Sequence, residues 1–206
     1  MTLTVTPDVL IPRDDTTVVT ELAIKKALFL NQNPRILDLC TGSGCIGLAI
    51  AKRVKDARVT LGDVSQGALR VARRNIMDQK LATRVKCLPI DVLKPAQDFL
   101  GTFDLIVSNP PYIPTEIWKT LDPSVRDFEP RLALDGGDDG LDFYRAILEN
   151  FTSALQPGGW ICFEFGIGQE NDVCSLLRQH GYEITELRKD SAEITRAVLA
   201  RKREES

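Results

Sequence analysis

The chain has 206 residues, 43% of them hydrophobic, which is a size and composition that favour one domain with a substantial core. No apolar stretch approaches the roughly 18 to 20 residues of a membrane-spanning helix, and the N-terminus lacks the basic and apolar regions of a signal peptide. We therefore expect a cytoplasmic protein. The net charge of −3 argues against a broad surface for nucleic-acid phosphates.

The apolar runs alternate with segments of helical period, which is the pattern of an α/β protein with a parallel sheet. The predicted helices run from an N-cap at Asp15 or Thr16 to just before Asn33, and over residues 45–54, 65–79, 141–155 and 169–180. The predicted strands are residues 35–39, 58–61, 85–90, 103–108, 160–165, 183–187 and 194–200. The last two strands are expected to form a hairpin at one edge of the sheet. With no repeat or linker in the sequence, one domain is the simplest interpretation.

The connections between these elements are also predicted. A long polar loop joins the strand at 103–108 to the helix at 141–155, and Pro157 with the two following glycines is expected to stop that helix. Ser65 is expected to cap its helix, and Gly181 to close the one that ends at His180. His180 is the only histidine and the cysteines form no C-x-x-C pair, so we expect reduced core cysteines and no metal site.

Asn109, Pro110, Pro111 and Tyr112 follow directly after the apolar run 103–108, so they are expected at the carboxyl end of a buried strand. The two prolines fix φ and drive the preceding residues away from helix, which makes this loop stiff. The carboxamide of Asn109 and the nearby carbonyls are then held ready to accept hydrogen bonds beside an aromatic ring. Such a loop suits a planar group that carries an NH2, either an amide or a nucleobase.

A second motif, G-x-G-x-x-G at Gly42, Gly44 and Gly47, lies between the first strand and its helix. Alone it is typical of a tight turn or, with Asp63 further on, of a dinucleotide site. Asp38 changes this interpretation, because a carboxylate there would oppose a pyrophosphate but attract an ammonium. S-Adenosylmethionine carries an ammonium, a ribose and no phosphate.

On this hypothesis Asp63 holds the ribose hydroxyls, and Asp91, after the third strand, accepts from the adenine amino group. The expected cofactor-binding residues are Asp38, Thr41, Gly42, Ser43, Gly44, Cys45, Asp63, Val64, Asp91, Val92 and Asn109.

These motifs resemble those of class I S-adenosylmethionine-dependent methyltransferases that modify amino groups. More specifically, residues 9–13, 103–113, 129–137 and 140–145 resemble the bacterial release-factor glutamine N5-methyltransferases, the HemK/PrmC family. The resemblance covers nearly the whole chain. It implies a Rossmann-like, seven-stranded, mostly parallel sheet with an antiparallel C-terminal hairpin and helices on both faces.

The resemblance also implies the substrate, which is the glutamine of the Gly-Gly-Gln motif in class 1 peptide chain release factors. S-Adenosylmethionine would become S-adenosylhomocysteine. The expected catalytic residues are Asn109, Pro110 and Tyr112: Asn109 Oδ1 and the Pro110 carbonyl accept the two amide hydrogens, and Tyr112 packs on the carboxamide. Substrate binding adds Pro111 and Arg13, the latter at the mouth of the site. We expect a monomer that binds neither a membrane nor a nucleic acid.

The sequence departs from the family pattern at two places. Asp14 stands for a proline and Thr17 for a glutamate after Arg13, which changes the rigidity and charge of the rim. Relatives usually carry an N-terminal helical docking domain that is absent here, so residues 1–206 are expected to form the catalytic domain alone, with 1–14 as a leading segment or hairpin. Three alternatives stay open: a ribosomal-protein glutamine methyltransferase, a nucleic-acid adenine N6 methyltransferase, and a cofactor-binding module that is inactive without its docking domain.

Overall fold

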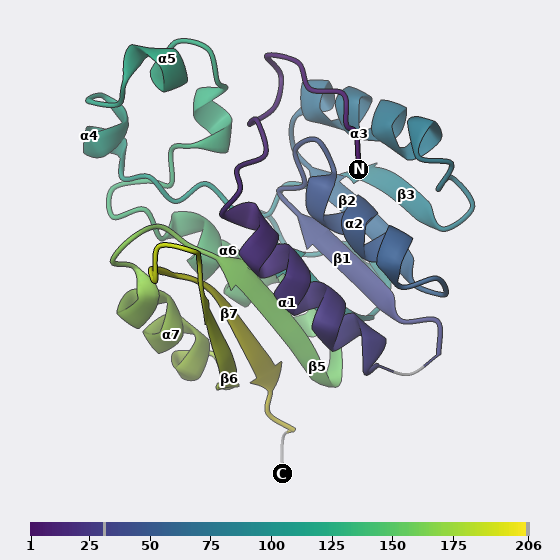
Figure 1. The fold of residues 1–206 in the computed structure, drawn as a ribbon. Helices are drawn as coiled ribbons and strands as arrows, with labels where there is room; N and C mark the ends of the chain where they lie inside the picture. Colours follow the sequence, from purple (N-terminus) through teal and green to yellow (C-terminus); the bar gives the residue numbers. More distant parts are fainter. Residues whose placement is uncertain (31, 205–206) are drawn as a thin grey trace.

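The computed structural model describes residues 1–30 and 32–204, and these residues form a seven-stranded sheet of order β3-β2-β1-β4-β5-β7-β6 (Figure 1). The strands are β1 (Arg35–Leu39), β2 (Arg58–Asp63), β3 (Val85–Pro89), β4 (Phe103–Ser108), β5 (Leu155–Glu164), β6 (Tyr182–Lys189) and β7 (Thr195–Lys202). The first five run parallel, whereas β7 is antiparallel to both β5 and β6. The predicted α/β fold with its C-terminal hairpin is confirmed.

Helices cover both faces of the sheet because neighbouring strand residues point to opposite sides. The longer helices are α1 (Thr16–Leu28), α2 (Cys45–Arg53), α3 (Gln66–Asp78), α6 (Asp142–Phe151) and α7 (Glu170–Gln179). Ile36 faces a core built with α1, α2 and α3, and the next residue, Leu37, faces a second core built with α6 and α7. Figure 1 shows α1 and α2 together on one side of the sheet.

The predicted helix at 141–155 is too long and the strand after it starts too late. α6 ends at Phe151 and a 3-10 turn follows, η3 (Thr152–Ala154), after which β5 begins at Leu155. Phe103 of β4 pairs with Leu155 and Leu105 pairs with Trp160, so residues 156–159 bulge out of the strand. The Pro157-Gly158-Gly159 stretch is therefore a bulge rather than a helix stop, which the positive φ of Gly158, 68°, permits.

Other boundaries differ by a few residues. α1 ends at Leu28 rather than just before Asn33, and β2 extends to Asp63. The two predicted helix caps are confirmed. The Ser65 side chain accepts from the Ala68 amide at the start of α3, and His180 is the C-cap of α7, followed by Gly181 at φ 81°. Helix ends fray, so errors of this size are expected from sequence.

The predicted long loop after β4 is a small lobe with one-turn helices, seen at the upper left of Figure 1. It contains α4 (Thr115–Trp118), α5 (Pro123–Arg126) and the 3-10 turn η2 (Arg131–Ala133). A parallel bridge between Ile113 and Asp135 closes its base, with amide-to-carbonyl distances of 2.9 and 2.8 Å. We call residues 113–135 the side lobe.

The leading segment, residues 1–14, forms no hairpin. Its backbone bonds instead to α3: the Thr4 amide donates to Asn75 Oδ1 at 2.8 Å, and Asn75 Nδ2 donates to the Thr4 carbonyl at 2.9 Å. Because the side chain of Asn75 satisfies this backbone, no strand partner is required. Val9 is buried against Ala68 and Val71 of α3, so the segment lies close to the carboxyl end of the sheet.

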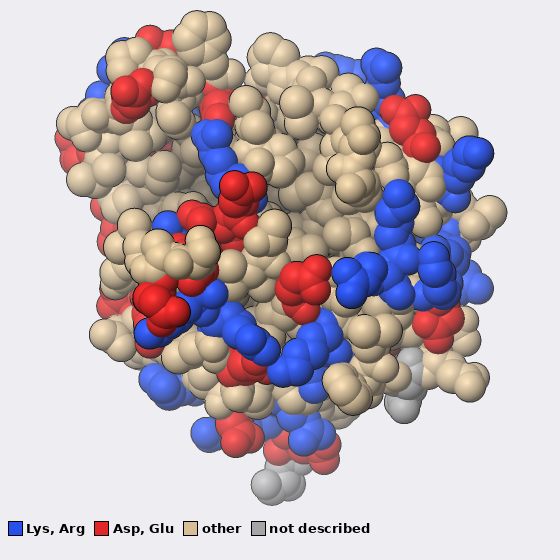
Figure 2. Space-filling model, viewed as in Figure 1, with Lys and Arg blue, Asp and Glu red and all other residues tan. Residues whose placement is uncertain are grey.

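Among the described helices, none has the length and apolar character needed to cross a membrane. Figure 2 shows acidic and basic side chains interspersed over much of one face, with Lys and Arg gathered on the side where α2 lies.

Candidate active site

The glycine-rich loop between β1 and α2 is held from below by Asp38. This carboxyl group is fully buried, and its Oδ2 accepts from Thr41 Oγ1 at 2.6 Å and from the Gly47 amide at 2.9 Å. Burial raises the pKa of Asp38 to about 7, and these two hydrogen bonds oppose the rise. Its Oδ1 has no hydrogen-bond partner among the residues that the structure describes. Through its bonds to Thr41 and Gly47, Asp38 therefore fixes the conformation of the loop.

A cavity of about 240 Å³ lies at the carboxyl ends of β1 to β4, where ligands bind in open α/β sheets. It is bordered by the glycine-rich loop, the leading segment, α1 and the side lobe. The predicted site residues in its wall are Thr41, Gly42, Ser43, Cys45, Asp63, Val64, Asp91, Val92, Asn109 and Pro111. One cavity thus brings together residues that follow four strands.

Two of the predicted carboxylates border this cavity. Asp63, at the end of β2, accepts from the Gly42 amide through Oδ2 and from the Ser65 amide through Oδ1, each at 2.9 Å. Burial raises its pKa, which the bonds from the Ser65 and Gly42 amides oppose. Asp91, after β3, accepts from the Leu93 amide and pairs with Lys94 at 3.1 Å. Both carboxylates are thereby fixed in orientation and retain free lone pairs.

Asn109 comes directly after β4 and is half-buried in the cavity wall. Its Nδ2 donates to Thr16 Oγ1 of α1 at 3.3 Å. This bond engages the NH2 end of the carboxamide, so Oδ1 is the end available to accept a hydrogen bond.

Five predicted site residues lie outside the cavity wall as the described residues form it: Asp38, Gly44, Pro110, Tyr112 and Arg13. Gly44 is the N-cap of α2, with φ 84°, and Pro110 is buried. Arg13 is paired with the buried Glu129 of the side lobe at 2.5 Å. Arg13 therefore ties the leading segment to the lobe at the rim.

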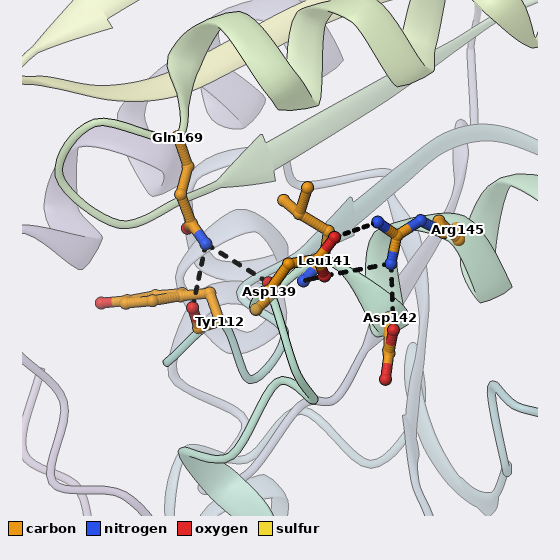
Figure 3. A network of polar contacts seen from close by, with 7 residues as sticks. Tyr112, Asp139, Leu141, Asp142, Arg145 and Gln169 are labelled. Atoms are coloured by element: carbon orange, nitrogen blue, oxygen red, sulfur yellow. Dashed lines mark hydrogen bonds and ion pairs between the residues drawn. The ribbon is translucent and has the colours of Figure 1, made fainter. Parts of the chain in front are cut away.

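Tyr112 is held by neighbours on the side of α7. Its carbonyl accepts from Gln169 Nε2 at 3.0 Å (Figure 3), and a Cβ built on Gly166 would come within 3.0 Å of its ring. Burial raises the pKa of Tyr112 to about 12, which keeps the phenol neutral. Gln169 Nε2 also donates to the Gly140 carbonyl at 3.3 Å, and Gln169 Oε1 accepts from the Gly166 amide at 2.9 Å.

The sequence predictions missed several parts of the cavity wall. Thr16 was considered only as an N-cap, yet its side chain is buried and contacts Asn109. The departures Asp14 and Thr17 lie on either side of the start of α1, and Thr17 Oγ1 donates to the Asp14 carbonyl at 2.6 Å. Further wall residues outside the predicted set include Asp8, Val9, Leu10, Pro12, Pro130, Leu132, Ala133 and Phe143. All of these except Asp8 lie in segments that carry the family resemblance, but the sequence predictions did not assign them to the wall of a cavity.

Residues 17–120 match the family model described as Methyltransferase small domain. The release factor glutamine methyltransferase of Clostridium acetobutylicum is 45% identical over 193 residues, which cover 93% of this chain and 67% of that protein. The corresponding protein of Geobacter sulfurreducens is 46% identical and covers 86% of this chain and 60% of its own length. The corresponding protein of Moorella thermoacetica is 45% identical, and the match covers 98% of this chain and 70% of that protein. The chain thus spans 60 to 70% of the length of these relatives.

Solved structures agree. The release-factor-specific protein-(glutamine-N5) methyltransferase of Alicyclobacillus acidocaldarius is 28% identical with a TM-score of 0.57, covering 97% of this chain and 99% of that chain. A methyltransferase of Pyrococcus furiosus, 20% identical with a TM-score of 0.70 and covering 98% of this chain and 88% of that chain, shows the same fold.

The sheet order, the glycine-rich loop after β1 and the carboxylates after β2 and β3 define a Rossmann-like methyltransferase of class I. Within that class, the 45% identity to two release factor glutamine methyltransferases identifies the family. The chain belongs to the release factor glutamine methyltransferases, which are protein-(glutamine-N5) methyltransferases.

Proposed function

We propose that this chain transfers a methyl group from S-adenosylmethionine to the side-chain nitrogen of the glutamine in the Gly-Gly-Gln motif of class 1 peptide chain release factors, in the cytoplasm. The observation that carries the proposal is the orientation of Asn109. Its NH2 group is engaged by Thr16, so its carbonyl oxygen is left as an acceptor in the wall of a cavity with two fixed carboxylates.

The cavity residues fit the proposed cofactor. A Cβ on Gly42 would meet no atom within 4 Å, which leaves open space beside the loop for a ligand. Asp63 would hold the ribose hydroxyls and Asp91 the adenine amino group, while buried Asp38 fixes the shape of the loop through its bonds to Thr41 and Gly47. When bound, S-adenosylmethionine supplies a methyl group activated by a sulfonium.

The chain's own task is to position a weak nucleophile. An amide nitrogen shares its lone pair with the carbonyl, so it reacts only when it is held in line and its pyramidal form is favoured. Asn109 Oδ1 accepts one amide hydrogen and the Pro110 carbonyl the other, while Pro111 and Tyr112 keep the loop stiff and close the site around the carboxamide.

The exposed side chains of the side lobe are an argument that the substrate is a protein. Pro130, Leu132 and Ala133 line the cavity, and the same lobe exposes large apolar side chains, with Phe128 75% and Ile117 53% exposed. Exposed apolar groups beside an active site suit contact with a folded protein. Arg13, paired with Glu129 at the rim, would hold the lobe in place as the substrate enters.

The variant Asn109→Ala tests the proposal. It removes the acceptor without a charge change, so we expect cofactor affinity within about twofold of wild type and transfer lowered at least about 100-fold. Affinity is measured by calorimetry and transfer by incorporation of labelled methyl into a release factor. Asn171→Ala, at an exposed position on α7, is the matched control and should behave as wild type.

Three substrates are compared in the same assay: a class 1 release factor, total ribosomal proteins and DNA. Label at the Gly-Gly-Gln glutamine supports the proposal. Label found only in ribosomal protein or only in nucleic acid would replace it with that activity.

A further inference from the structure

Glu164, the last residue of β5, carries a buried carboxyl group for which the proposed chemistry has no role. The residue is 2% exposed, and its Oε2 has no hydrogen-bond partner among the described residues. Its backbone carbonyl is anchored by the hydroxyl of Tyr144 at 2.8 Å. Ser108 of β4 pairs with Phe163 of β5, and Asn109 and Glu164 are the residues that follow them along these two neighbouring strands.

Two polar side chains lie within hydrogen-bonding reach of this carboxyl. They are the hydroxyl of Thr16 and the amide of Asn109, and both favour the charged form of Glu164. Thr16 is itself buried and accepts from Asn109 Nδ2. The three residues come from α1, the end of β4 and the end of β5, and we call them the Glu164 cluster.

The direction of each hydrogen bond in this cluster follows from counting donors. A carboxylate only accepts, and a hydroxyl has a single hydrogen to donate. When Thr16 donates that hydrogen to the charged Glu164, its oxygen can only accept from Asn109. Asn109 must then present its NH2 to Thr16, which leaves Oδ1 on the opposite side of the carboxamide.

We propose that Glu164, acting through Thr16, sets the orientation of the Asn109 carboxamide and so makes Oδ1 the atom that meets the substrate amide. Glu164 is a positioning residue, since it does not line the cavity in the described part of the chain. The role of Oδ1 rests on the proposed function, whereas the orientation itself does not.

Protonation of Glu164 reverses this order of donors. A neutral carboxyl donates, the Thr16 hydroxyl can turn its hydrogen toward Asn109, and Oδ1 is then the end that Thr16 attracts. Burial raises the pKa of Glu164 to about 7, with Asp15 adding to the rise and Arg196 opposing it. The change therefore falls near neutral pH. The other titratable groups that interact with Glu164 are Tyr112, Tyr144, Cys45 and Cys162.

Asp38 has a pKa of about 7 as well, so the Glu164→Gln variant is needed to assign the titration to Glu164. Arg196 is bridged to Asp15 at 2.9 Å and to Asp190 at 2.8 Å, and its charge is constant over the range of interest. Burial raises the pKa of each of the two tyrosines and two cysteines, so all four stay neutral at pH 7.

The orientation is tested without substrate or cofactor by the side-chain amide signals of Asn109 in ¹⁵N-labelled protein. The signals are assigned by their loss in Asn109→Ala. In the wild type we expect the Asn109 amide signals to shift with pH, with a midpoint near pH 7. In Glu164→Gln and in Thr16→Val we expect this pH-dependent shift to disappear. Thr20→Val is the matched control, because Thr20 Oγ1 donates to the Thr16 carbonyl and not to the cluster. Signals that stay constant from pH 5.5 to 8.5 in the wild type, or that titrate unchanged in Glu164→Gln, overturn the proposal.

Turnover supplies the second test. Glu164→Gln and Thr16→Val should each lower kcat by about 10- to 100-fold with cofactor affinity unchanged, and the double variant should be no worse than the singles. Glu164→Asp, which keeps the charge, should have a kcat between that of Glu164→Gln and that of the wild type. Wild-type kcat should fall as pH drops below about 7, and the residual kcat of Glu164→Gln should depend less steeply on pH.

Wild-type kcat in folded Glu164→Gln contradicts the inference. Absence of glutamine methylation by the wild type contradicts the proposed function instead, and the amide signals then decide the inference alone.

Discussion

At the scale of single residues, Gly47 occupies a position where the packing leaves no room for a side chain. It lies in α2, where a Cβ would clash with Leu61 and come within 2.9 Å of Asp38 Oδ2 and 3.0 Å of Val59. The absence of a side chain lets α2 approach β1 and β2 closely enough for the Gly47 amide to reach Asp38. The glycine is thus required by packing as well as by the loop.

The substitution Gly47→Ala should lower the free energy of unfolding by about 1–3 kcal/mol, despite the better helix propensity of alanine, because buried side chains must move to accommodate the methyl group. Urea denaturation measures this change. Gly67→Ala in α3 is the comparison: its Cβ would meet only Asp8 of the leading segment, whose carboxylate can rotate away and whose Cβ, at 2.9 Å, must shift slightly, so the loss of stability should be smaller than at Gly47. Equal effects of the two substitutions would contradict the packing argument.

At the scale of elements, Gln169 joins three segments that are distant in sequence. One carboxamide bonds Gly166 in the loop between β5 and α7, Tyr112 in the loop after β4 and Gly140 in the loop before α6. Figure 3 shows the bond to Tyr112. Arg145 of α6 binds Asp139 and Asp142 nearby, which fixes the loop before α6. The stiff loop of Asn109 to Tyr112 is therefore held in place from outside as well as by its prolines.

Replacing Gln169 by Ala leaves up to three backbone groups without a partner, so we expect a loss of about 1–3 kcal/mol in the free energy of unfolding. We also expect a lower kcat with little change in cofactor affinity, since Asn109 and Tyr112 share the loop. Gln179→Ala, at the exposed end of α7, is the control and should leave both quantities unchanged. A Gln169→Ala protein as stable and active as wild type would show that the prolines alone hold the loop.

At the scale of the whole molecule, two buried carboxyl groups near the proposed active site lower the stability of the protein near neutral pH. Burial raises the pKa values of Asp38 and Glu164 to about 7 from 3.8 and 4.5. A carboxyl group whose folded-state pKa is raised contributes stability while it is protonated. That contribution is complete below the unfolded pKa and is lost as pH rises through about 7.

We therefore expect the free energy of unfolding to fall between about pH 5 and pH 7.5, by an amount of the order of a few kcal/mol. Below about pH 4 the sign reverses, because ion pairs and hydrogen bonds lower the pKa values of Asp139, Asp190 and other surface acids. Denaturation series at several pH values measure the slope, and Glu164→Gln should make it shallower. A free energy that rises steadily from pH 5 to 7.5 would show that the two carboxyls are not protonated in the folded state.

Much of this architecture was accessible from the sequence, because it depends on local patterns. Alternating apolar strands and amphipathic helices predict a parallel α/β sheet, and glycines or acids directly after strands must gather at its carboxyl edge. The loop of Asn109 to Tyr112 is stiff for a reason visible in its composition. The bulge at 156–159 was not predictable, since Pro-Gly-Gly suits a helix stop equally well and only the pairing with β4 selects the bulge.

By itself, then, the sequence determined the sheet, the cavity edge and the family, because backbone periodicity and short motifs act over a few residues. The tertiary structure alone decided which atoms face one another. It packed Thr16 of α1 against Asn109, buried Glu164 behind them and paired Arg13 with Glu129 across 116 residues. These contacts join elements far apart in the chain, and no local pattern encodes the direction of a hydrogen bond between them.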